Sequence, residues 1–197
     1  MYWKTYLDKL VAALLIIALL PMFALVFLVL YISEGRPVLF SQMRSGQGMV
    51  PFKMYKFRSL PVGNEGGLDM ADRQPNAVGR AIRALGIDEL PQLVHIITGH
   101  MSFVGPRPLP VAYAPLYGAP HLARFAVKPG ITGWAQVNGR NNMSWGKRFE
   151  LDSWYVDHIS VLLDLKILVM TIRLLVANVF EHKPAQDMRV FDGFNLD

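Results

Sequence analysis

The sequence predicts a mainly helical α+β fold that is attached to a membrane by its N-terminal part. Three observations predict this fold: an apolar run of 23 residues from Leu10 to Ile32, a β-hairpin pattern in residues 38–58, and several helix-length segments after it. A chain of 197 residues is long enough for one domain plus a membrane segment. We therefore expect a membrane helix in residues 1–35, one domain at the membrane surface in residues 36–180, and a tail in residues 181–197.

The composition favours a membrane-attached globular protein. Hydrophobic residues make up 52% of the chain, and the mean hydropathy is +0.28. The net charge of +5 suits an anionic membrane surface or a phosphorylated substrate. We expect no nucleic-acid partner, because no basic helix, zinc-ligand spacing or strand-borne aromatic motif accompanies that charge. The absence of cysteine excludes disulfides, thiolate catalysis and cysteine metal sites.

The apolar run has Pro21 at its centre, and proline disrupts helix hydrogen bonding, so we expect a break or a bend between Ile17 and Pro21. The run is longer than a signal-peptide core, and no small-x-small cleavage site follows it. Cationic residues flank both ends, with Lys4 and Lys9 before the run and Arg36 after it. Such flanks suit a re-entrant helix, which enters the membrane and returns to the same face; a kinked transmembrane helix is the alternative.

The segments after the run predict a small hairpin followed by short helices. The hairpin comprises residues 38–42 and 51–58, and its second strand alternates cations with apolar residues, which could face either headgroups or a substrate. We expect helices in residues 78–85 and 88–98, and broken short helices in 109–124. Residues 128–140 contain too many glycines for a core helix, so we expect a loop there. Residues 144–159 form an expected amphipathic helix. Residues 163–180 form an apolar helix that lies at the membrane interface or in the protein core.

Two adjacent carboxylates, Asp88 and Glu89, are the candidate catalytic residues. One interpretation is structural, since Asp is a preferred helix N-cap and Glu fits a first helical turn. Arginines in the surrounding sequence favour the other interpretation, a phosphate and metal site, because their planar groups match phosphate oxygens. Asp88 would then attack phosphorus as a nucleophile. Arg80 and Arg83 precede the pair, Arg107 lies in a stiff Pro-Arg-Pro turn, and Arg140 is the residue to test first in the segment 128–140.

The sequence contains four motifs: residues 52–59 (FKMYKFRS), 88–93 (DELPQL), 101–108 (MSFVGPRP) and 128–140 (KPGITGWAQVNGR). Together they resemble the bacterial sugar transferases, also called monotopic phosphoglycosyl transferases. The likeness runs in the family's order from Met1 to about Phe180 and extends to the small members that start bacterial N-linked glycan assembly by transferring phospho-N,N'-diacetylbacillosamine. There are two departures: Leu20 precedes Pro21 where the family often has serine, and His100 stands where an acidic residue is common before Met-Ser.

The resemblance implies a two-step transfer at the cytoplasmic face of the bacterial inner membrane. A phospho-sugar, expected to be N-acetylated or diacetamido, would pass from a UDP-sugar to undecaprenyl phosphate, with release of UMP. This would be the first membrane step of glycoconjugate assembly. Asp88 would carry the covalent phospho-sugar and bind Mg²⁺, and Glu89 would position the metal or manage protons. Arg83, Arg107 and Arg140 would bind phosphate and nucleotide, and residues 10–32 would form a re-entrant helix.

Two other functions fit parts of the sequence. A non-catalytic membrane-surface module would bind anionic lipid through the basic strand and would need neither Asp88 nor Mg²⁺. A membrane diphosphate hydrolase would release free sugar phosphate without a lipid acceptor. No feature of the sequence selects an oligomeric state.

Overall fold

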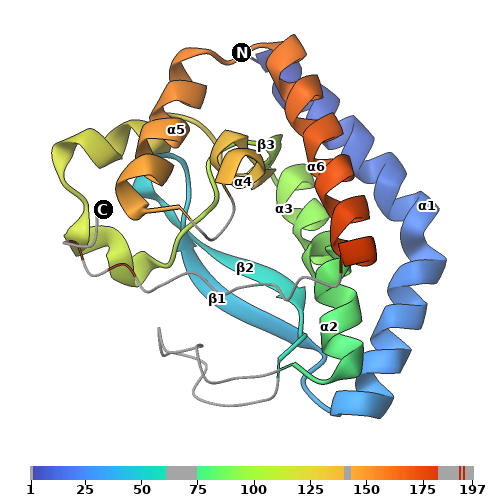
Figure 1. Ribbon diagram of the computed structural model, residues 1–197. Coiled ribbons are helices and arrows are strands. Elements are labelled where there is room, and N and C mark those ends of the chain that lie inside the picture. Colours follow the sequence, from blue (N-terminus) through green and yellow to red (C-terminus); the bar gives the residue numbers. More distant parts are fainter. Residues whose placement is uncertain (1, 61–74, 140–142, 182–190, 192, 194–197) are drawn as a thin grey trace.

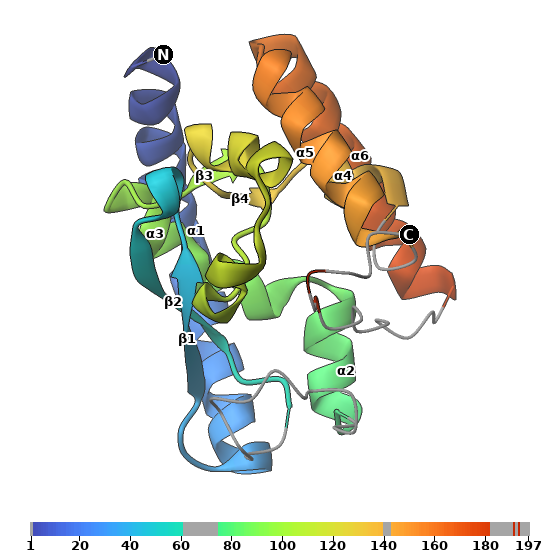
Figure 2. The ribbon, with the colours of Figure 1, turned by 90° about the vertical axis from the view of Figure 1, so that its left-hand side faces the viewer.

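The computed structural model describes residues 2–60, 75–139, 143–181, 191 and 193, and its fold is the mainly helical α+β architecture that the sequence predicts (Figure 1). In Figure 2, α1 and the hairpin lie on one side of the molecule and α4 to α6 on the other. The elements in chain order are α1 (Tyr2–Glu34), β1 (Leu39–Ser45), η1 (Gln47–Met49), β2 (Pro51–Phe57), α2 (Ala77–Ala84), η2 (Ile87–Gln92), α3 (Leu93–Ile97), β3 (Ser102–Val104), η3 (Val111–Leu116), η4 (Ala119–Ala126), β4 (Gly130–Thr132), α4 (Trp134–Gly139), α5 (Trp145–Asp157) and α6 (Val161–Glu181).

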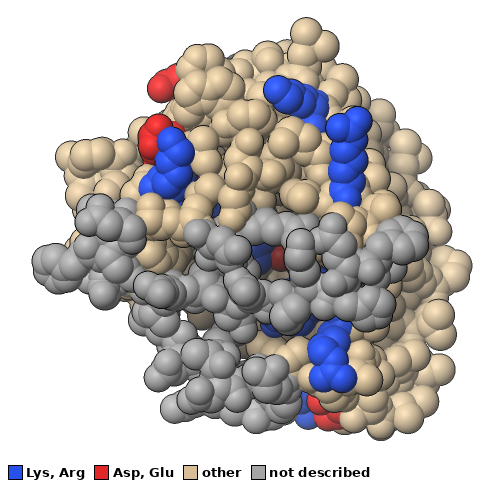
Figure 3. Space-filling model, viewed as in Figure 1, with Lys and Arg blue, Asp and Glu red and all other residues tan. Residues whose placement is uncertain are grey.

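The N-terminal helix α1 continues through Pro21, and Figure 1 shows it as a bent helix. The expected disruption is therefore a bend and not a break, since proline removes one hydrogen bond of the helix while the others hold the chain together. Its inner face supplies Ala12, Val26 and Leu30 to the core. Its outer face is apolar and exposed, and the edge of the molecule where α1 lies is almost free of charged groups (Figure 3).

Helix α6 also has an exposed apolar face, made by Leu162, Leu165, Val169, Ile172 and Val176. Exposed apolar areas of this size are unusual on a protein surrounded by water. Among the described residues, α1 is the helix that is long and apolar enough to cross a membrane. The two helices therefore offer the surface through which this protein can associate with lipid.

The predicted hairpin is confirmed. Strands β1 and β2 pair antiparallel, from Leu39 opposite Phe57 to Ser45 opposite Pro51. Phe52 and Met54 point into the core, which Ala12 of α1 shares. Directly after β2, the buried guanidinium of Arg58 donates to the carbonyls of Glu34 at 2.5 Å and Gly35 at 2.9 Å, so it holds the end of α1 on the hairpin.

Residues 128–139 are not the loop that their glycines predict. They contain β4, which pairs in parallel with β3, and then α4. The glycines are needed because two backbones approach each other closely here: a Cβ on Gly130 would lie 2.1 Å from the nitrogen of Gly105. Such close approach is possible only without side chains.

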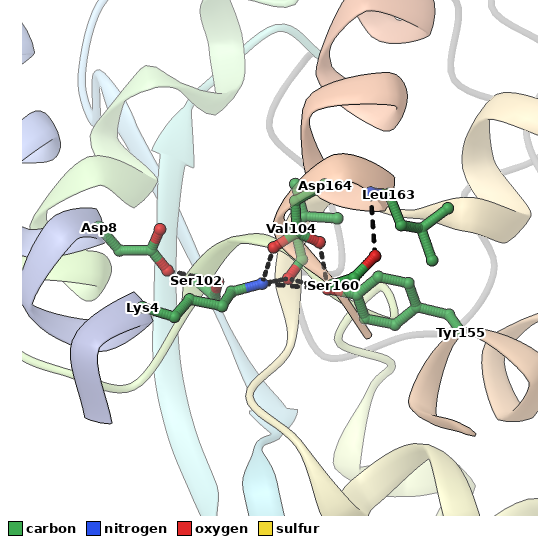
Figure 4. A network of polar contacts seen from close by, with 8 residues as sticks. All are labelled: Lys4, Asp8, Ser102, Val104, Tyr155, Ser160, Leu163 and Asp164. Atoms are coloured by element: carbon green, nitrogen blue, oxygen red, sulfur yellow. Dashed lines mark hydrogen bonds and ion pairs between the residues drawn. The ribbon is translucent and has the colours of Figure 1, made fainter. Parts of the chain in front are cut away.

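A polar network ties the start of α1 to α6, β3 and α5 (Figure 4). The ammonium of Lys4 contacts the carboxylate of Asp164 at 2.5 Å, the carbonyl of Val104 at 3.1 Å and the hydroxyl of Tyr155 at 3.0 Å. Tyr155 in turn donates to Asp164 at 2.7 Å, and Ser102 donates to Asp8 at 2.5 Å. Both ends of α1 are thus fixed to the same domain.

The tail also contributes to the core, which the sequence did not predict. Phe191 is 1% exposed and packs among aromatic rings that include Tyr113, Trp145 and Phe149. Its backbone N–H donates to the hydroxyl of Tyr113 at 3.2 Å. Phe191, in the expected tail, therefore belongs to the same hydrophobic cluster as residues of η3 and α5.

Replacing Lys4 by methionine should destabilise the protein by about 2 to 4 kcal/mol, because Asp164 would stay largely buried without its cation. The measurement is the free energy of unfolding in detergent. The matched control is Lys147→Met at the exposed Lys147–Glu150 pair, which should cost less than about 1 kcal/mol. Equal effects of the two substitutions would contradict the role given to the network.

Candidate active site

The two carboxylates lie in η2, a 3-10 helix that follows α2 after a sharp turn at Gly86. Gly86 has a φ of 68°, in the left-handed region that favours glycine, and its Cα faces Leu175 of α6. The prediction of one helix from residue 88 to 98 is wrong, since η2 extends to Gln92 and the α-helix begins at Leu93. Pro91 explains the difference, because it cannot donate the α-helical hydrogen bond to Ile87.

The capping interpretation of Asp88 is also wrong. The N-cap of η2 is Gly86, which makes no side-chain cap hydrogen bond, and Asp88 lies inside the helix. On either side of the carboxylates, Ile87 and Leu90 pack into a cluster that contains Val26 and Leu30 of α1. The apolar flanks of the pair are therefore bound to the membrane helix.

Asp88 is a buried carboxylate, with 8% of its surface exposed. Burial raises the pKa of Asp88 to about 6, and the neighbouring charge of Glu89 adds to this effect. Lys56, Arg83 and Arg107 act in the opposite direction, since each favours the ionised form. The carboxylate is thus held in surroundings where its charge is costly unless a further cation approaches.

The cations around Asp88 come from three separate parts of the chain. Lys56 lies on β2, Arg83 on α2, and Arg107 on the turn after β3. Burial lowers the pKa of Lys56, and the charge of Asp88 counteracts this. Lys56 was not among the predicted site residues. From the sequence, the cations of its strand could face either lipid headgroups or a substrate. The structure places Lys56 near the carboxylates.

Glu89 and Arg107 form an ion pair in which the guanidinium donates to the carboxylate at 2.8 Å. The charge of Glu89 raises the pKa of Arg107, so this arginine remains charged. Both side chains keep partial exposure, 21% for Glu89 and 33% for Arg107. Glu89 therefore fixes the guanidinium beside Asp88 while leaving part of it accessible.

The backbone that carries Arg107 is held at successive carbonyls. The carbonyl of Pro106 accepts from Gly130 at 3.0 Å, that of Pro108 from the side chain of Arg44 at 3.1 Å, and that of Leu109 from Ser45 at 2.9 Å. The carbonyl of Arg107 accepts from the side chain of Arg124 at 2.7 Å. Since both flanking prolines also restrict φ, the turn is rigid as the sequence predicts.

Behind this turn lies a buried ion pair that sequence reasoning missed. Arg124 of η4 and Asp152 of α5 are 3% and 2% exposed, and their closest N–O distance is 2.9 Å. Burial raises the pKa of Asp152, and the charge of Arg124 opposes the shift. Nothing in the sequence marks the two as partners, because they lie in different segments and belong to no common motif.

Of the predicted substrate-binding residues, Arg83 and Arg107 lie near Asp88, and Arg140 falls outside the described residues. Arg44 is a further cation that was not predicted. Burial lowers the pKa of Arg44 to about 10, and the nearby Arg107 contributes to the shift. Because this pKa is still well above neutral, Arg44 stays charged and adds a cation near Arg107.

The donor set fits Mg²⁺, which takes oxygen ligands and commonly uses one or two carboxylates together with substrate phosphates. Asp88 supplies a carboxylate. Its pKa is raised although three cations lie nearby, so these cations do not fully offset the cost of burying its charge. Within the described part of the chain, no group of three or more His, Cys, Asp or Glu side chains gathers. A metal here would thus depend on ligands from a substrate.

Comparisons with known proteins show the family to which the chain belongs. The family model for the bacterial sugar transferases matches residues 1–178. The chain is 52% identical to the uncharacterized sugar transferase EpsL of Bacillus subtilis, over 71% of this chain and 70% of that protein. It is 37% identical to proteins named UDP-glucose:undecaprenyl-phosphate glucose-1-phosphate transferase from Escherichia coli and Caulobacter vibrioides. The alignments cover 84% and 86% of this chain, but 38% and 68% of those two proteins.

The buried carboxylate, the cations on three elements around it and the exposed apolar helices are the features expected of a membrane-associated enzyme that acts on phosphate. The family match is more specific: this chain belongs to the bacterial sugar transferases, a family of phosphoglycosyl transferases. Membership of an enzyme family disfavours the alternative of a non-catalytic membrane-surface module.

Asp88→Asn should stabilise the protein at pH 7.5 by about 1 to 3 kcal/mol in the absence of metal, because it removes a buried charge next to Glu89. The sign follows from linkage. The folded pKa is about 6 and the unfolded one about 3.8, so wild-type stability should fall as pH rises from 4 through 6.

The measurement is thermal unfolding of both proteins in EDTA at pH 5 and pH 7.5. The gap between variant and wild type should widen at the higher pH. An equal difference in stability at both pH values would show that ionisation of Asp88 does not destabilise the folded protein.

Proposed function

We propose that this protein transfers a sugar 1-phosphate from a UDP-sugar to undecaprenyl phosphate, giving undecaprenyl-diphosphate-sugar and UMP. One observation carries the proposal: a buried carboxylate, Asp88, faces cations that come from three separate elements. A carboxylate can attack phosphorus only if nearby cations neutralise the phosphate that would repel it.

In the first step an oxygen of Asp88 attacks the phosphorus that bears the sugar. The bond from this phosphorus to the bridging oxygen breaks, and UMP leaves with both electrons of that bond. In the second step an oxygen of undecaprenyl phosphate attacks the same phosphorus. The acyl phosphate bond then breaks, which restores the carboxylate of Asp88 and releases the lipid-linked product.

Arg107, Lys56 and Arg83 bind the phosphate oxygens in this scheme. Glu89 positions Arg107 through their 2.8 Å ion pair. Asp88, together with the phosphates of the substrate, would hold Mg²⁺. The metal supplies positive charge that reduces the repulsion between the carboxylate and the phosphate. We keep Arg140 as a nucleotide-binding residue on the basis of the motif alone.

We further propose that α1 is re-entrant and that the domain lies at the cytoplasmic face of the inner membrane. The bend in α1 supports this, as do the anchors at its two ends: Lys4 is bound to Asp164 and the final carbonyls are bound to Arg58. A helix that crosses a bilayer carries its ends to opposite faces. Two ends attached to one small domain are easier to reconcile with entry and return on the same face.

The donor that we propose to test first is UDP-glucose. The relatives whose names state a donor carry glucose in the name, whereas the sequence motifs alone led to the expectation of an N-acetylated or diacetamido sugar. Both classes of donor, including the bacillosamine-type sugar of N-linked glycosylation, therefore belong in the assay. The product of either would start assembly of a lipid-linked glycoconjugate.

The test is UMP release from a panel of UDP-sugars with Mg²⁺, with and without undecaprenyl phosphate. Wild type should release UMP from one donor and form the lipid product. Asp88→Asn should lose at least about a thousandfold of this activity, because the nucleophile and a metal ligand are removed together. Turnover by Asp88→Asn at the wild-type rate would disprove the nucleophile assignment. Free sugar phosphate formed without lipid would instead indicate a hydrolase.

Arg107→Ala should lower kcat/KM roughly 10- to 100-fold, since a charge-assisted hydrogen bond contributes about 1.5 to 3 kcal/mol. Arg107→Lys should recover part of the loss, because lysine keeps the positive charge. The recovery should be incomplete, because lysine lacks the planar group with several donors. The kinetic measurement is paired with thermal unfolding, which separates weaker phosphate binding from misfolding. Wild-type kinetics in a folded Arg107→Ala protein would show that Arg107 does not bind the substrate.

A further inference from the structure

We propose that Arg124 and Asp152 are positioning residues for the transfer, and that they act by fixing Arg107. The proposal rests on the function proposed above. Its basis is a continuous set of contacts: Glu89 binds the guanidinium of Arg107, Arg124 binds the carbonyl of the same residue, and Asp152 binds Arg124. No motif in the sequence assigns Arg124 and Asp152 to the site.

The geometry shows that a single guanidinium performs two tasks. One terminal nitrogen of Arg124 donates to the carbonyl of Arg107 at 2.7 Å and also lies 2.9 Å from the carboxylate of Asp152. The Nε of Arg124 donates to the same carboxylate oxygen at 3.1 Å. Arginine suits this place because its donors are fixed in one plane, whereas lysine offers one nitrogen on a flexible chain.

Burial makes the arrangement specific. Both side chains are almost fully enclosed, and the guanidinium of Arg124 also lies over the rings of Phe125 and Phe149, at 5.4 and 5.5 Å from their centroids. An enclosed charge pair is costly to break, because the group left behind would be a buried charge. Arg124 therefore transmits the position of α5, through Asp152, to the backbone of the Pro-Arg-Pro turn.

Arg124 is not itself placed to bind a nucleotide. The cavity that it lines together with Ser45, Arg107 and Pro129 measures about 10 Å³, which is close to the space needed for one water molecule. A phosphate or a base does not fit there. Its contribution to the reaction must pass through Arg107.

The test uses Arg124→Lys, which keeps a positive charge for Asp152 but loses the geometry that also holds the carbonyl of Arg107. We expect a folded protein whose kcat/KM for the UDP-sugar falls at least tenfold. The loss should divide between kcat and KM in the same proportion as in Arg107→Ala. In an Arg107→Ala background, Arg124→Lys should cost less than a further twofold, because the side chain that it positions is already absent.

The matched control is Arg58→Lys. Arg58 is also a buried arginine that donates to backbone carbonyls, but it holds the end of α1. Any loss that it causes should appear in full in the Arg107→Ala background. If Arg124→Lys does not fold, Asp152→Asn replaces it in the same comparison, since asparagine keeps the shape of the carboxylate and its capacity to accept.

The inference is wrong if Arg124→Lys keeps wild-type kinetics, if its loss repeats in full without the Arg107 side chain, or if neither variant folds, because the pair would then serve only the fold. These outcomes differ from failure of the proposed function. In that case the wild-type protein itself would release no UMP from any donor.

Discussion

The structure depends on one costly feature, a carboxylate enclosed by protein. A buried charge is tolerated when opposite charges are fixed around it, and removing one partner leaves the other uncompensated. Around Asp88 this requirement explains the arrangement of distant segments. The hairpin brings Lys56, α2 brings Arg83, and the turn that follows the paired strands β3 and β4 brings Arg107. The fold thus places cations from three elements near one carboxylate.

The cations themselves need support, because long side chains lose conformational freedom when they are held in place. The structure provides this support in successive layers. Glu89 orients the end of Arg107, the carbonyls of the Pro-Arg-Pro turn are bound on both sides, and Arg124 with Asp152 fixes the centre of the turn. A site organised in this way has little reorganisation left when the charge moves during phosphoryl transfer.

The sequence predicted those features that depend on neighbouring residues. Hydrophobic alternation located the hairpin, and the adjacent carboxylates and the Pro-Arg-Pro turn located Asp88, Glu89 and Arg107. Features that arise from contacts between distant segments were missed: Lys56 beside Asp88, Arg124 with Asp152, and Phe191 in the core. Local patterns also failed at Lys128–Gly139, where glycines that permit a close approach of two backbones resemble the glycines of a loop.

The helix α1 packs directly against the segment that carries the two carboxylates. Ile87 and Leu90, on either side of the two carboxylates, pack against residues of α1, and a Cβ on Gly86, the N-cap of η2, would lie 3.2 Å from the side chain of Leu175 of α6. An acceptor with a polyprenyl chain keeps that chain in lipid while its phosphate enters the site. Because residues of α1 pack against η2, side-chain packing sets the distance between the apolar surface of α1 and Asp88. Displacing α1 would therefore move the carboxylates as well as the membrane anchor.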